Sequence, residues 1–126
     1  MLAYKLTLRM REINFYETES GKSPVIDFLN SLTGKQAQKI TWVLELVEET
    51  SIIPKQYFKK LINTEDIWEV RITFAGDIFR LLGFFEEDGN FIITNGFAKK
   101  TQNTPQKEIK LAEDRRRNYY ERKKSK

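Results

Sequence analysis

The segment IWEVRITFAGDIFRLLGFFEEDGNFIITNGFAK, residues 67–99, decides the fold. It contains three runs rich in aromatic and β-branched residues: 67–73, 78–85 and 91–99. Two glycine-containing dipeptides separate these runs, Ala75-Gly76 and Asp88-Gly89. Such dipeptides close short hairpins, because glycine adopts positive φ without a steric penalty. The segment therefore predicts three consecutive antiparallel strands.

The two turns also predict how the strands align. If each turn is a two-residue loop, Arg71 lies opposite Arg80, and Arg80 lies opposite Phe97. The other face then pairs apolar residues with one another or with glycine: Val70 with Leu81, Ile72 with Phe79, Trp68 with Gly83, Leu81 with Gly96, and Phe85 with Ile92. We therefore expect one apolar core face and one exposed face that carries cations.

The rest of the chain predicts helices and outer strands. Residues 11–17 alternate between apolar and polar and predict a strand, and 57–61 predict another. Capping residues open two amphipathic helices, at 23–32 and 34–50, and Pro105 opens a long charged helix. We expect an α+β fold, in which two N-terminal helices and a C-terminal helix pack on a small, mainly antiparallel twisted sheet.

Composition limits the chemistry that the chain can perform. With 126 residues, it is long enough for one domain with a modest core. It has no cysteine and no histidine, which excludes disulfides, thiolate metal sites and the usual general base. Its apolar runs are too short to span a membrane, and its start lacks the apolar stretch of a signal peptide. We expect a cytoplasmic protein without metal or cofactor.

Charge is distributed unevenly along the chain. Residues 1–98 contain 11 basic and 14 acidic residues, whereas 99–126 contain 11 basic and 4 acidic residues. A tail with a net charge of +7 attracts polyanions or an acidic partner. The alternative interpretation is a solvated charged helix.

The opposed arginines suggest an anion site. Like charges at opposed positions destabilise a sheet by a few tenths of a kcal/mol or more, so an anion between them is favoured. A phosphodiester fits, because guanidinium groups bind phosphate oxygens bidentately, and Phe97 is placed to stack on a base. Asn95 and Lys99 flank Phe97 on the same face. The alternative is that Glu69, or an acid from the last helix, neutralises the arginines.

Two lysine pairs are further candidates for contact with a nucleic acid. Lys99-Lys100 ends the last predicted strand, and Lys59-Lys60 lies in an outer strand. The alternative for the first pair is an ordinary solvated strand end. For the second pair it is protection of a sheet edge against aggregation, a common use of lysine.

Residues 67–120, together with FYETESGKSPVIDFLNSL at 15–32, resemble the HigB-like branch of the RelE/ParE toxin superfamily. The resemblance covers about residues 11–120. Its most specific features are the Trp-Glu-Val-Arg strand, the Phe-Arg strand after the glycine turn, and the Gly-Phe-x-Lys-Lys-Thr-Gln-x-Thr-Pro segment.

The resemblance implies a toxin that cleaves mRNA on the ribosome without metal or cofactor. It also implies a cognate antitoxin of the helix-turn-helix type, and contact with operator DNA only through the toxin–antitoxin complex. Arg71 and Arg80 match two basic positions of the family site, and Lys99 or Lys100 matches a third. Since relatives begin near Met10, we expect residues 1–9 to be a poorly ordered extension and 10–126 to be one toxin domain.

The implied reaction is attack of an RNA 2′-OH on the adjacent phosphate, which yields a cyclic phosphate and a 5′-OH. The arginines would stabilise the charge of the transition state, and the lysine would hold the phosphate or protonate the leaving oxygen. We further expect the last helix to dock on ribosomal RNA through Arg115, Arg116 and Arg117. Alternatively, Ile109, Leu111, Ala112 and Tyr119 anchor this helix on the sheet, and its charges keep the protein soluble.

Two other functions fit the same resemblance and charge pattern. The first is a ParE-like inhibitor of DNA gyrase that lacks nuclease activity. The second is a basic RNA-binding module without catalysis. The paired arginines and Lys99-Lys100 favour cleavage over both.

Overall fold

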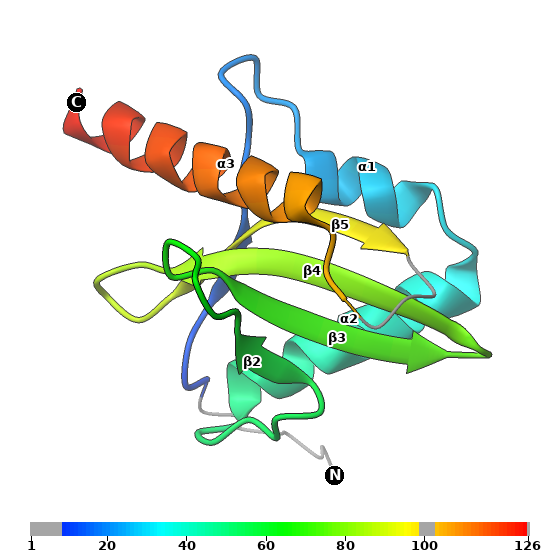
Figure 1. The fold of residues 1–126 in the computed structure, drawn as a ribbon. Helices are drawn as coiled ribbons and strands as arrows, with labels where there is room; N and C mark the ends of the chain where they lie inside the picture. The colour runs from blue at the N-terminus through cyan, green and yellow to red at the C-terminus, as the bar shows by residue number, and fades with distance from the viewer. Residues whose placement is uncertain (1–8, 99–102, 126) are drawn as a thin grey trace, which may run out of the picture.

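The computed structural model describes residues 9–98 and 103–125 and shows three layers. Helices α1 (Pro24–Asn30) and α2 (Gly34–Glu49) cover one face of a sheet, and α3 (Gln106–Lys124) crosses the other (Figure 1). The sheet has the strand order β1-β5-β4-β3-β2, and only β1 is parallel to its neighbour. Its strands are β1 (Ile13–Phe15), β2 (Phe58–Lys60), β3 (Trp68–Phe74), β4 (Asp77–Phe85) and β5 (Phe91–Ala98). The predicted α+β architecture is confirmed.

The hairpin of β3 and β4 has the predicted register. Ala75 and Gly76 have φ values of 51° and 84°, as a two-residue turn of type I′ requires. Arg71 therefore lies opposite Arg80, and the apolar pairs of the other face form as expected, among them Val70 with Leu81.

The hairpin of β4 and β5 differs from the prediction near its turn. The backbone N–H of Glu86 donates to the carbonyl of Asn90, so the loop has three residues rather than two. Phe85 consequently pairs with Phe91 and not with Ile92. A bulge follows, because Leu82 pairs with Asn95 but Gly83 pairs with Ile93. Beyond the bulge, the predicted pairs Leu81–Gly96 and Arg80–Phe97 are present.

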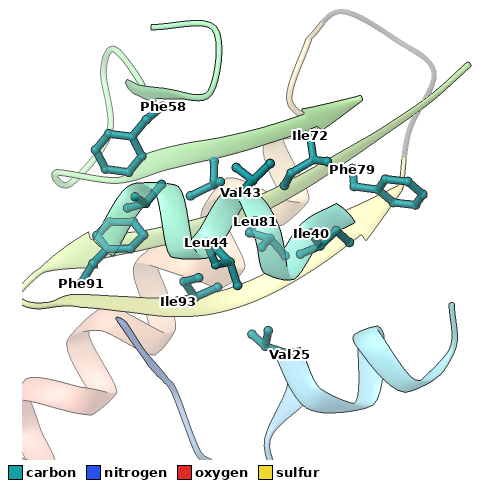
Figure 2. Close-up of a cluster of buried hydrophobic side chains, with 12 residues drawn as sticks. Val25, Ile40, Val43, Leu44, Phe58, Ile72, Phe79, Leu81, Phe91 and Ile93 are labelled. Carbon is teal, nitrogen blue, oxygen red and sulfur yellow. The ribbon is translucent and has the colours of Figure 1, made fainter. Parts of the chain in front are cut away.

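The main core lies between the sheet and the N-terminal helices (Figure 2). Apolar residues at helical spacing in α2 are fully or almost fully buried against the strand face that carries Ile72 and Leu81. Helix α1 approaches β5 at Gly96, where an added Cβ would lie 2.7 Å from the Phe28 ring. A side chain at this position would therefore push α1 away from the sheet.

Helix α3 packs on the opposite face through a narrow apolar stripe. Ile109 and Ala112 are buried with Leu82, and the rings of Tyr119 and Tyr120 lie 5.5 and 5.6 Å from that of Phe84. No helix within residues 9–98 and 103–125 is long and apolar enough to cross a membrane. The expected extension at 1–9 lies outside the described residues except for Arg9.

Candidate nucleic-acid interface

Arg80 is buried, which corrects the expectation that it is exposed. Its side chain is 1% exposed, and its Nη1 lies 3.8 Å from Oε2 of Glu69, which is buried to the same degree. Arg80 Nη1 also donates to the Thr104 hydroxyl at 3.1 Å, and that hydroxyl donates to Glu69. The sequence left two interpretations open, an anion site or neutralisation of the arginines by an acidic residue. For Arg80, the structure shows neutralisation by Glu69.

Topology explains this buried cluster. Glu69 and Arg71 lie two residues apart on one face of β3, and Arg80 lies opposite Arg71, so Glu69 is a diagonal neighbour of Arg80. Thr104 precedes α3, and the start of that helix covers the pair. A buried cation requires such a partner, since an unpaired charge away from water costs several kcal/mol.

Arg71, in contrast, reaches solvent at the edge of the sheet. The ladder between β2 and β3 reaches Val70, and just before β2 the carbonyl of Tyr57 accepts from the backbone N–H of Arg71 at 2.8 Å. There Arg71 lines an open pocket of about 310 Å³. The other lining residues are Lys39, Val43, Gln56, Tyr57 and Thr73, so the lining contains two cations and no carboxylate.

An exposed aromatic ring extends this cationic surface onto α2. Trp42 is 50% exposed, its ring lies 6.5 Å from that of Tyr57, and Lys39 Nζ lies 4.8 Å from its centroid. We call Lys39, Trp42, Tyr57 and Arg71 the edge site. Sequence reasoning identified only Arg71 of these four. Trp42 offered a signal, because it lies outside the buried stripe of α2 that includes Val43 and Val47.

Asn95 and Phe97, which were also predicted for the central site, do not line the pocket of Arg71. Asn95 is 4% exposed and donates to the carboxylate and the carbonyl of Glu108 in α3. Phe97 is partly buried against the cluster that contains Ile109. Lys99 and Lys100 lie outside the described residues. Helix α3 therefore covers, at least in part, the side chains of Asn95 and Phe97 that were predicted to contact RNA.

The three arginines predicted to dock on RNA hold α3 in place. Arg115 donates to the carbonyl of Thr94, the residue at the bulge, and burial lowers the pKa of Arg115. Arg116 lies over the rings of Phe84 and Tyr120 and pairs with Asp66 at 3.7 Å. Arg117 pairs with Glu65 and Asp114. The anchoring residues therefore include cations as well as the apolar stripe.

Lys59 and Lys60 are exposed on β2. Lys59 lies opposite Glu69, and Lys60 Nζ lies 3.0 Å from Asp66. The hydrogen bond from Lys60 holds the pKa of the Asp66 carboxyl below its ordinary value. Within the described ranges, no group of three or more acidic residues is placed to hold a metal ion.

Comparison with known proteins identifies the family. No curated protein matches the chain. Residues 27–117 match the family described as "Phage derived protein Gp49-like (DUF891)". The fold is similar to that in the crystal structure of an archaeal RelE–RelB complex from Pyrococcus horikoshii OT3, with a TM-score of 0.50 at 15% identity over 74% of this chain and 98% of that one. Since the family match spans most of its length, the chain belongs to the phage-derived Gp49-like family, a RelE/HigB-type toxin family.

Proposed function

We propose that the protein is the toxin of a toxin–antitoxin pair and cleaves mRNA bound to the ribosome in the cytoplasm. The observation that carries this proposal is the edge site, where Arg71, Lys39 and Tyr57 line one pocket and the Trp42 ring lies beside Lys39 and Tyr57. Guanidinium and ammonium groups bind phosphate, and aromatic rings stack on unpaired bases. Single-stranded RNA presents both features.

The proposed reaction forms a bond between the 2′ oxygen and phosphorus and breaks the bond from phosphorus to the 5′ oxygen. The 2′-OH loses a proton, the 5′ oxygen gains one, and the products are a cyclic phosphate and a 5′-OH. Arg71 and Lys39 stabilise the negative charge that develops on the phosphoryl oxygens. Lys99 or Lys100, which follow Ala98 at the end of β5, hold the phosphate or protonate the leaving oxygen.

In this scheme Arg80 is a positioning residue in the conformation described. Its guanidinium is held by Glu69 and Thr104, so it does not contact the phosphate directly. It acts instead through the strand that carries Arg71 at the opposed position. The ribosome aligns the mRNA, which lowers the demand for a strong base at the site.

We propose a cognate antitoxin of the helix-turn-helix type as the partner, with operator DNA bound through the complex alone. The similarity of the fold to a RelE crystallised with RelB supports an antitoxin as the partner. Lys59 and Lys60 are exposed on β2 and remain proposed RNA contacts.

Primer extension on cellular mRNA after induction tests the function. The wild type is expected to produce discrete cuts within translated codons, and Arg71→Ala and Lys39→Ala are expected to reduce them at equal protein abundance. Lys35→Ala is the matched control, because Lys35 is an exposed lysine one turn earlier on α2. Intact mRNA with DNA damage would instead indicate a gyrase inhibitor. Ribosome binding without cuts would indicate a non-catalytic RNA-binding module.

A further inference from the structure

A second pocket, of about 590 Å³, is lined by residues of β2, β3 and β4 and of the segment between α2 and β2. Its floor is aromatic and its rim is basic, with Lys55, Phe58, Lys59, Lys60, Trp68 and Phe85 among the lining residues. We call it the aromatic pocket. None of the residues that line it is acidic.

The floor consists of rings that hold one another in place. Phe58 and Trp68 are stacked, with centroids 4.8 Å apart and planes 16° from parallel. Phe85 meets both rings edge-on, at 5.7 and 5.3 Å. Figure 2 shows Phe58 and Phe91 at one end of the core, far from Phe79 at the other end. The floor is therefore the continuation of the main core.

Helix α2 stops before it covers this end of the core. It ends at Glu49, and Arg11 binds the carbonyls that follow, donating to Thr50 at 2.8 Å. Trp68 and Phe85 consequently remain partly exposed, whereas Phe58 is buried. Arg11 binds the end of the helix, which leaves Lys55, Lys59 and Lys60 as the other cations of the lining. Lys60 Nζ also lies 3.0 Å from Asp66, in a surface pair whose side chains are 53% and 65% exposed.

We propose that the aromatic pocket is a nucleotide subsite for single-stranded RNA, in which a base stacks on Trp68 and Phe85, and Lys55 and Lys60 each bind one of the phosphates beside that base. Proteins bind single-stranded RNA with aromatic rings and neighbouring cations. The rings stack on the bases, and the cations bind the phosphates that link the nucleotides. The inference rests on the proposed function, since the RNA would be the mRNA held at the edge site. Adjacent residues link the two sites: Tyr57 lines the edge pocket, and Phe58 lines the aromatic pocket.

Fluorescence of Trp68 reports on this subsite directly. The chain has two tryptophans, so Trp42→Phe leaves Trp68 as the single reporter. Titration of that protein with a short single-stranded oligonucleotide RNA is expected to quench Trp68. In the same background, Lys55→Gln with Lys60→Gln is expected to weaken binding about tenfold at low salt and to reduce the salt slope by roughly 1.4, the value for two phosphate contacts with a single strand.

Two further arms separate the possible outcomes. Lys35→Gln, an exposed lysine on α2, should leave the titration unchanged. Arg71→Ala should retain the quenching of Trp68 even where it abolishes mRNA cuts, so failure of the subsite and failure of the proposed function are distinguishable. Absence of quenching by RNA, or quenching that is unaffected by the lysine pair, would overturn the proposal. Equal quenching by a polyglutamate peptide would also overturn it, in favour of an acidic protein partner.

Discussion

Glu69→Gln is expected to destabilise the fold strongly, because it removes the carboxylate that neutralises Arg80. Both side chains are 1% exposed, so water cannot replace the lost charge. Glutamine preserves the volume and can still accept a hydrogen bond from Thr104. The cost is therefore mainly that of a buried, uncompensated guanidinium, about 3–5 kcal/mol. Against a typical total of roughly 5–15 kcal/mol, this is a large fraction of the stability.

Thermal and urea unfolding measure this effect. For a chain of this size, the expected loss corresponds to a fall in Tm of roughly 10–20 °C. Glu65→Gln is the matched control, because Glu65 pairs with Arg117 on the surface, where the side chains are 41% and 51% exposed. This control is expected to lower the Tm far less, because an exposed pair contributes only about 0.2–1 kcal/mol. If Glu69→Gln melts at the wild-type temperature, the buried pair does not support the fold as argued.

A double variant separates the structural role of the pair from any catalytic role. Replacing both partners, as in Glu69→Leu with Arg80→Met, removes the two charges together and leaves neither one buried alone. Substitutions of this kind are often neutral or stabilising by about 1–4 kcal/mol. The double variant is therefore expected to recover most of the stability that Glu69→Gln loses. Its toxicity then tests whether the charge of Arg80 is needed, without the complication of an unfolded protein.

Three further predictions concern packing and ionisation. Gly96→Ala is expected to cost about 1–3 kcal/mol in urea unfolding, because the added Cβ meets Phe28 and Leu81, whereas Gly34→Ala, in open space, should not destabilise. Lys60→Gln is expected to raise the pKa of Asp66 in an NMR titration, since Lys60 holds that pKa below its ordinary value. The stability that the lowered pKa of Asp66 contributes is present above pH ~4 and is lost as the pH falls. Burial, followed by the hydrogen bond to Glu86, raises the pKa of Tyr119, so its contribution to stability is complete below pH ~10 and is lost as the pH rises further. Tyr119→Phe should remove a tyrosine ionisation that absorbance detects above pH ~10.

The sequence predicted the parts of the fold that depend on neighbouring residues. Ala75-Gly76 determined the first hairpin, and the opposition of Arg71 and Arg80 followed from it. Asp88-Gly89 was misread, because glycine at positive φ closes a three-residue loop as readily as a two-residue loop. The bulge that restores the register was not visible in the local pattern, since it depends on pairing between strands.

The candidate site was harder to predict because its residues come from distant elements. The burial of Arg80 depends on α3, which a strand pattern does not place. Lys39 comes from α2, Tyr57 from the segment that precedes β2, and Arg71 from β3. No spacing in the sequence predicts that these three residues line one pocket. Charge counts also do not reveal which arginines of α3 have a partner within the chain, such as Asp66 for Arg116.

The most direct test of the central claim is an end-group analysis of mRNA incubated with purified protein and ribosomes. Cuts are expected only when ribosomes are present, with a cyclic phosphate on one fragment and a 5′-OH on the other. Arg71→Ala, with an unchanged Tm, is expected to lose the cuts, while Lys35→Ala retains them. Intact mRNA with the wild type, or cutting by Arg71→Ala at the wild-type rate, would contradict the account.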